Sequence, residues 1–161
     1  SSTTPSGRGW ECGTLWCRYF FLCREQTAEL LFKIPPMMIL NELNEFDCSE
    51  LNNLKFWEIT KEEFENIVPL KPEDMEKQID LVFKFFDSMH DAFPNINDIV
   101  CISHGMVTRY IYHYLTGNKG ISAYDVINSN GFKFYNLDLL VYDTETKEIK
   151  DYHNRDHITH F

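Results

Sequence analysis

The 161-residue chain has no apolar run of the ~18 residues that a membrane-spanning helix needs. Its most apolar stretch, residues 30–40, is interrupted by Lys33, Pro35 and Pro36. The chain also has no basic start followed by an apolar segment and a small-residue cleavage site, which is the pattern of a secretory signal. We therefore expect a soluble, cytoplasmic protein that does not bind membranes.

Basic residues and cysteines are both scarce. The chain has 15 Lys and Arg against 25 Asp and Glu, which gives a formal net charge of −10. Such a charge repels phosphate backbones and anionic lipids, so nucleic acid is not an expected partner. The five cysteines are odd in number, and their spacings fit neither a disulfide framework nor paired C-x-x-C zinc sites. We expect them to be reduced thiols.

The residues that are present suffice for one core. Hydrophobic residues make up 43% of the chain and aromatic residues 15%, too many for a disordered protein. The first 24 residues differ from the rest, because they contain no Lys, Asn, Ile or Asp but three of the five Cys. We interpret residues 1–24 as an atypical segment (a tag, a truncated start or misassigned sequence) before a single domain, residues 25–161. A short buried strand at residues 16–22 is the alternative.

Several helices and strands are expected to alternate along the domain. Residues 25–33 predict a short helix that Pro35 and Pro36 end, and residues 41–53 predict a polar loop with several carboxylates. Pro72, followed by two acidic residues, predicts the start of a long helix that Pro94 stops. Apolar residues at four- and three-residue steps predict its buried stripe: Met75, Ile79, Val82, Phe86, Met89 and Phe93.

The second half predicts strands on both sides of a helix. Residues 98–103 (D-I-V-C-I-S) predict a buried parallel strand, and residues 107–115 predict a helix that Gly117 caps. Residues 132–142, a polar turn and a last strand predict a hairpin. The expected fold is therefore an α/β sandwich, with a mostly parallel sheet that has antiparallel edges and is flanked by helices.

The motif that points most directly to a ligand site is I-S-H-G at residues 102–105, where the predicted strand ends and the predicted helix begins at once. Ligands of open α/β sheets bind at the carboxyl ends of the strands. The N-terminus of a helix attracts anions, and Gly105 would allow a ligand to approach the backbone closely. The pattern favours a phosphate held beside His104. A purely structural histidine at a strand end is the alternative.

The order of several short motifs resembles the phosphoglycerate mutase-like branch of the histidine phosphatase superfamily, over about residues 26–158. The motifs are Q-T-A-E at 26–29, L-N-E at 40–42 with Glu50 after it, K-P-E-D at 71–74, V-C-I-S-H-G-M-V-T-R-Y-I at 100–111, I-N-S-N-G at 127–131 and Y-H-N-R-D-H-I at 152–158. The resemblance implies a three-layer sandwich and phosphoryl transfer or hydrolysis of a small phosphomonoester through a phosphohistidine. It implies no metal or organic cofactor.

The resemblance also assigns catalytic roles. His104 matches the second histidine, which stabilises the transferring charge, and Glu42 matches the acid that protonates the leaving oxygen. A carboxyl group beside a bound phosphate is pushed toward protonation by the like charge, which suits that role. Without the family, Glu42 would be interpreted as a solvated loop carboxylate.

Other residues match the substrate-binding part of the family's site. They are Gly105, His157, which borders the pocket in relatives, and Arg24, which stands one place after the family's conserved arginine. Arg109 matches a position that is often basic. The alternatives are an ion pair for Arg109 and a surface location for His157.

One element of the family is missing from the sequence. No histidine precedes His90, so the Arg-His-Gly nucleophile is absent. Since residues 1–24 are atypical as well, we expect a truncated or inactive version that lacks the first strand. The alternative is a non-catalytic, phosphate-binding regulatory pseudoenzyme. A replacement nucleophile at Cys23, and zinc bound by His153, His157 and His160, are further alternatives. The expected partner is a small phosphorylated substrate, and a homodimer is an open alternative to a monomer.

Overall fold

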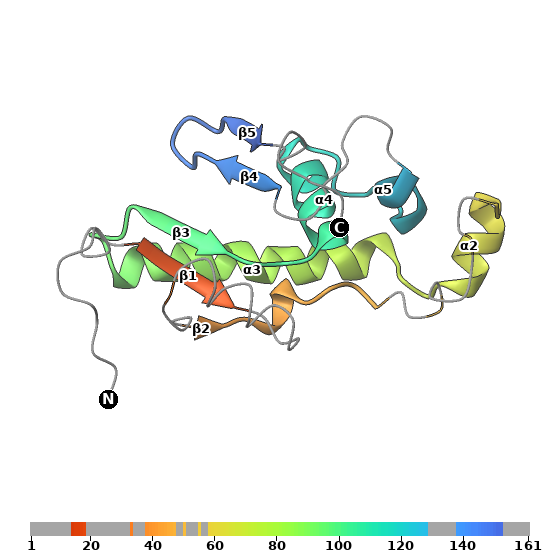
Figure 1. Ribbon diagram of the computed structural model, residues 1–161, viewed down its shortest axis with the longest axis horizontal. Helices are drawn as coiled ribbons and strands as arrows, with labels where there is room; N and C mark the ends of the chain where they lie inside the picture. Colours follow the sequence, from red (N-terminus) through yellow and green to blue (C-terminus); the bar gives the residue numbers. More distant parts are fainter. Residues whose placement is uncertain are drawn as a thin grey trace. The chain divides into compact units, whose positions relative to one another are not determined.

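The structure, a computed structural model, describes residues 14–18, 33, 38–47, 50, 55, 58–128 and 138–152. The chain divides into two units, one made of Ser1–Asn44 with Gln78–Ser103 and the other of Glu45–Lys77 with His104–Phe161. The elements, shown in Figure 1, are β1 (Thr14–Arg18), β2 (Met38–Ile39), the 3-10 helix η2 (Asn41–Leu43), α2 (Lys61–Ile67), α3 (Pro72–Ala92), β3 (Asp98–Cys101), α4 (Gly105–Leu115), α5 (Ala123–Asn128), β4 (Leu139–Tyr142) and β5 (Ile149–Tyr152).

The first unit contains a parallel sheet with the strand order β2-β1-β3 (Figure 1). Leu15 is the register partner of Ile99, and Trp16 is that of Val100. The central strand therefore comes from the segment whose composition differs from the rest of the domain. It covers residues 14–18, earlier than the strand considered at 16–22. Thr and Trp favour strands, and a parallel ladder is made by backbone groups whatever the composition of the flanking chain.

Helix α3 confirms the helix predicted from Pro72. Glu73 and Asp74 lie in its first turn, and it ends two residues before Pro94. The predicted buried stripe is confirmed only in its first half. Met75, Ile79 and Val82 are fully buried, Phe86 and Met89 are half-buried, and Phe93 is 53% exposed. Phe93 lies beyond the last helical residue, so the helical period that predicted its burial no longer applies to it.

Helices α2 and α5 of the second unit pack against each other through one aromatic and one polar contact. The rings of Phe64 and Tyr124 meet edge to face, with centroids 5.5 Å apart. Lys61 Nζ donates a 2.7 Å hydrogen bond to Asp125 Oδ2, which lowers the pKa of Asp125 and raises that of Lys61. Phe64 is almost fully buried, so the apolar contact is the main source of stability here.

A complete capping box starts α2. Thr60 Oγ1 accepts from the backbone N–H of Glu63, and Glu63 Oε2 accepts from the backbone N–H of Thr60. We expect Thr60→Ala to lower the free energy of unfolding by about 1 kcal/mol, measured by urea denaturation, and Thr60→Ser to restore it. The hydrogen bonds from Thr60 lower the pKa of Glu63 below its ordinary 4.5, so the contribution of Glu63 is present above pH 4.5 and is lost as the pH falls below it. Equal stability of Thr60→Ala and wild type would contradict the prediction.

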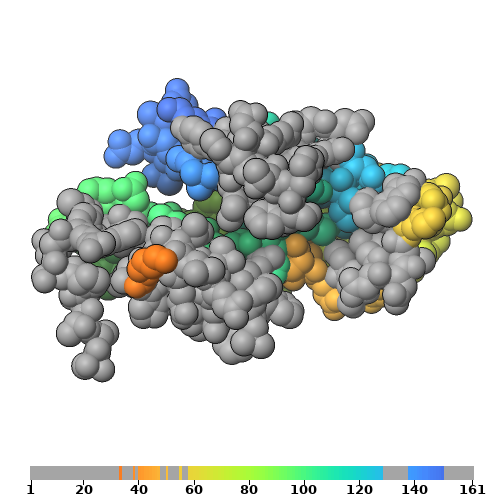
Figure 2. Space-filling model, in the orientation of Figure 1, coloured from red at the N-terminus to blue at the C-terminus, as the bar shows by residue number. Residues whose placement is uncertain are grey.

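The predicted hairpin is confirmed. β4 pairs with β5 in antiparallel register, and within the described residues the two strands form a sheet of their own. The antiparallel edges of the parallel sheet stay a prediction, because the described pairs of that sheet are parallel and the hairpin belongs to the second unit. Asp143 Oδ1 accepts from the backbone N–H groups of Glu145 and Thr146 in the turn, and this lowers the pKa of Asp143. The hairpin is blue on the face drawn in Figure 2, and its residues Leu139 and Val141 are exposed.

The α/β class is thus confirmed. Some other expectations concern residues that the structure does not describe. Apart from Lys33, the helix expected at 25–33 lies outside the described residues, as do the three histidines considered as zinc ligands. In the part of the chain that the structure describes, no helix is both long and apolar enough to span a membrane. Within the same residues, no three His, Cys, Asp or Glu side chains form a group that could hold a metal ion.

Candidate functional site

The strand–histidine–helix arrangement predicted from I-S-H-G is present. β3 ends at Cys101, and α4 begins at Gly105, so His104 is the N-cap residue of α4. Its backbone is extended, and its carbonyl accepts the first helical hydrogen bond, from Thr108 N at 2.9 Å. The Thr108 hydroxyl donates to the same carbonyl at 2.7 Å. His104 is only 7% exposed, so the turn delivers an imidazole into a nearly dry environment.

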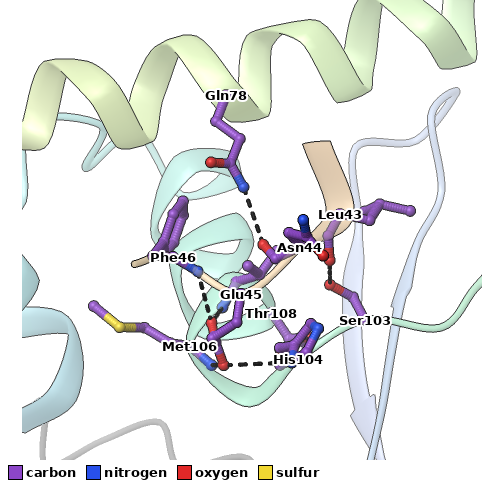
Figure 3. Close-up of polar contacts among 10 residues, drawn as sticks. Leu43, Asn44, Glu45, Phe46, Gln78, Ser103, His104, Met106 and Thr108 are labelled. Atoms are coloured by element: carbon purple, nitrogen blue, oxygen red, sulfur yellow. Dashed lines mark hydrogen bonds and ion pairs between the residues drawn. The ribbon is translucent and has the colours of Figure 1, made fainter. Parts of the chain in front are cut away.

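The anion found at the start of α4 is a carboxylate of the protein itself. Glu45 Oε2 accepts from Met106 N at 3.3 Å, and Glu45 Oε1 accepts from Val107 N at 3.2 Å. Oε2 also lies 3.9 Å from His104 Nδ1 (Figure 3). The first N–H groups of a helix have no partner within the helix and carry the positive end of its dipole, so they stabilise a carboxylate. Glu45 thus occupies donors at which a phosphate was expected.

An aromatic contact next to Glu45 holds this loop against α4. Phe46 is 3% exposed, and its ring meets that of Tyr110 edge to face, with centroids 5.6 Å apart. Tyr110 is fully buried, and its hydroxyl donates to the carbonyl of Lys119 at 2.7 Å. Residues 41–53 were expected to be a polar loop, yet Phe46 and Leu43 are buried. The contact of Phe46 with Tyr110 ties the loop to α4 and so places Glu45.

In the first unit, two side chains hold the backbone that directly precedes the site residues. Ser103, which is followed by His104, donates from its hydroxyl to the carbonyl of Leu43 at 2.8 Å. Gln78 Nε2 donates to the carbonyls of Glu42 and Asn44 at 2.9 and 3.0 Å. Figure 3 shows the hydrogen bond from Ser103 to Leu43 and the one from Gln78 to Asn44. Since backbone carbonyls that are buried need donors, Ser103 and Gln78 stabilise the loop in this conformation.

The structure places the predicted site residues as follows. His104 and Gly105 are adjacent at the start of α4, and Arg109, half-buried, follows about one turn later on the same helix. Glu42 is half-buried in η2 and belongs to the first unit, whereas His104 belongs to the second. Arg24 and His157 lie outside the described residues.

Glu45 is the residue that sequence reasoning missed. Its distance along the chain from α4 is large, 61 residues to Met106, and no fixed spacing links a carboxylate to a helix that far away. The only signal in the sequence was that α4 has no acidic residue in its first turn. A carboxylate from elsewhere in the chain is stabilised at such a helix start. The chain offers several carboxylates in residues 41–53, and the signal does not choose among them.

The site can donate hydrogen bonds to an anion and can exchange protons. It combines a buried imidazole, one carboxylate and backbone N–H groups at a helix start. An imidazole and a carboxylate supply two of the four ligands that zinc takes. Comparison of the chain with protein-family models, with curated proteins and with solved structures found no match. Any functional conclusion therefore depends on the residues themselves.

Proposed function

We propose that this domain binds a small phosphomonoester and transfers or hydrolyses its phosphoryl group through a phosphohistidine, in a three-layer sandwich of the histidine phosphatase type. The observation that supports the proposal best is His104. It is a nearly buried imidazole between a parallel strand and the start of an 11-residue helix. Both the carboxyl edge of a parallel sheet and the N-terminus of a helix favour anionic ligands.

The proposed chemistry has two steps. In the family that the chain resembles, the nucleophilic imidazole nitrogen of an Arg-His-Gly motif forms a bond to phosphorus while the bond from phosphorus to the ester oxygen breaks, and the leaving oxygen takes a proton from the carboxyl group that Glu42 matches. Water then attacks phosphorus and breaks the phosphorus–nitrogen bond, releasing inorganic phosphate and returning a proton to the carboxylate. His104 and the N–H groups of Met106 and Val107 stabilise the charge on the phosphoryl oxygens. Glu45 has to leave those N–H groups when the phosphoryl group binds them.

A second candidate is favoured by one observation on the sequence. No histidine precedes His90, so the chain contains no nucleophile at the family's position. A module that binds phosphate without turning it over needs only the residues around His104. We propose that this chain, as an enzyme of this type, is an inactive version, and the second candidate is a regulatory, phosphate-binding pseudoenzyme.

Replacement of His104 tests both candidates. Inorganic phosphate should bind to the purified chain, and His104→Ala should weaken that binding at least about tenfold, because a hydrogen bond to a charged group contributes about 1.5–3 kcal/mol. Binding is measured by isothermal titration calorimetry with phosphate and with vanadate. Hydrolysis of 4-nitrophenyl phosphate is measured in parallel. His90→Ala, which changes an exposed histidine at the end of α3, is the matched control.

The outcomes separate the candidates. Turnover that His104→Ala abolishes would show that the chain is an active enzyme. Binding that depends on His104 without turnover would support the inactive enzyme and the binding module. If phosphate and vanadate bind neither protein, or bind His104→Ala as well as wild type, both candidates are wrong.

Gly105→Ala should weaken phosphate binding without lowering the stability of the protein. A Cβ atom at Gly105 would have no other atom within 4 Å in the described residues, and alanine favours a helix over glycine by up to about 1 kcal/mol. The variant should therefore be at least as stable as wild type in urea denaturation. If a phosphate approaches this backbone, the added methyl group should weaken phosphate binding. Unchanged binding would remove Gly105 from the site.

A further inference from the structure

Two cysteines far apart in the sequence occupy neighbouring positions in the parallel sheet. Cys17 of β1 and Cys101 of β3 are register partners. Cys101 is the last residue of β3 and is half-buried. Neither residue takes part in the proposed function, and the composition alone predicted only reduced thiols.

The backbone geometry suits a covalent bridge. Neighbouring strands lie about 4.7–4.9 Å apart, so the Cα atoms of register partners are separated by about that distance. Disulfides form between Cα atoms about 4.4–6.8 Å apart. The Cα separation expected for this register pair therefore lies within the range that a disulfide spans.

We propose that Cys17 and Cys101 form a reversible disulfide when the folded chain meets hydrogen peroxide. The thiolate of one cysteine attacks a peroxide oxygen and becomes a sulfenic acid, and the expelled hydroxide takes a proton to give water. The second thiolate attacks that sulfur, forms the S–S bond and expels a second hydroxide, which becomes water. The two sulfur atoms lose two electrons in total, and the peroxide gains them. An external dithiol reverses the step by thiol–disulfide exchange.

Peptide mapping tests the bridge. The reduced full-length chain is oxidised with hydrogen peroxide, blocked with N-ethylmaleimide in denaturant and digested with trypsin. We expect one dominant cross-linked species that joins residues 9–18 to residues 85–109, with two hydrogen atoms fewer than the two reduced peptides and one maleimide adduct on the remaining cysteine, Cys12. Treatment with dithiothreitol should separate it. Recovery of Cys101 as its maleimide adduct after oxidation, or its pairing with Cys23 or Cys48, would overturn the proposal.

Two serine variants and an unfolded control make the test specific. Residues 9–18 contain both Cys12 and Cys17, so Cys12→Ser is the matched control and should keep the cross-link, whereas Cys17→Ser should abolish it. The opposite result would assign the bridge to Cys12. Oxidation in concentrated urea should replace the cross-link by pairs among Cys12, Cys17 and Cys23, since short loops close most readily in an unfolded chain. If the same cross-link dominates in urea, the register of β1 and β3 does not cause it.

Discussion

Tyr110→Ala should lower the free energy of unfolding by about 3–5 kcal/mol, the range for truncating a large buried aromatic side chain. Tyr110 is fully buried in α4, packs edge to face on Phe46 and donates a hydrogen bond to the carbonyl of Lys119. Alanine removes the ring contact, leaves a cavity and deprives that carbonyl of its donor. Urea denaturation followed by circular dichroism measures the loss.

Two further variants test the cause of the effect of Tyr110→Ala: one isolates the hydroxyl group, and the other is an exposed-ring control. Tyr110→Phe keeps the ring and removes only the hydroxyl, so it should lower the free energy of unfolding by about 1 kcal/mol. Phe93→Ala removes a ring that is 53% exposed and should have a much smaller effect than Tyr110→Ala. If Tyr110→Ala and Phe93→Ala destabilise the protein equally, Tyr110 is not part of its core.

Glu45→Ala should lower the free energy of unfolding by about 1.5–3 kcal/mol, because it removes a charged acceptor from two backbone donors at the start of α4. In the same variant, phosphate should bind more tightly, since Met106 N and Val107 N are no longer occupied by the carboxylate. The two changes have opposite signs, and general misfolding cannot produce that combination. Thermal denaturation with and without phosphate measures both.

A charge-matched control accompanies the Glu45 variant. Glu58→Ala removes one negative charge from an exposed residue whose ion pair with Lys55 contributes at most about 1 kcal/mol. It should change neither stability nor phosphate binding appreciably. If Glu45→Ala behaves like Glu58→Ala, the contacts of Glu45 with α4 are not significant in solution. If Glu45→Ala is destabilised but binds phosphate no better, the phosphate does not use those donors.

Local sequence patterns predicted the elements of the fold well where the cause is local. Pro72 and the acids after it mark the start of α3, and the change from an apolar run to helical spacing around His104 marks the end of β3 and the start of α4. A helix start and a helical period depend on residues within a few positions of one another. They can therefore be found in a single sequence.

Contacts between distant segments could not be predicted in the same way. The pairing of β1 with β3 and the placement of Glu45 at α4 depend on which segments meet in three dimensions. Composition distinguished residues 14–18 from the rest of the chain but gave no sign that they form the central strand of the parallel sheet. For the candidate site, the position of His104 was predictable because it follows from the strand end. The carboxylate beside it was not, because the motif L-N-E pointed to Glu42, three residues earlier.

The position of β1 in the sheet has a consequence for how the chain folds during synthesis. β1 leaves the ribosome before both of its partners, and β3 is made long after it. At about 5–20 residues per second, β1 waits several seconds for β3, with its backbone N–H and C=O groups unpaired on at least one side. The β4–β5 hairpin, whose strands are close in sequence, closes within microseconds once it is made. We therefore expect the parallel sheet to be the slow-folding and aggregation-prone part of this protein.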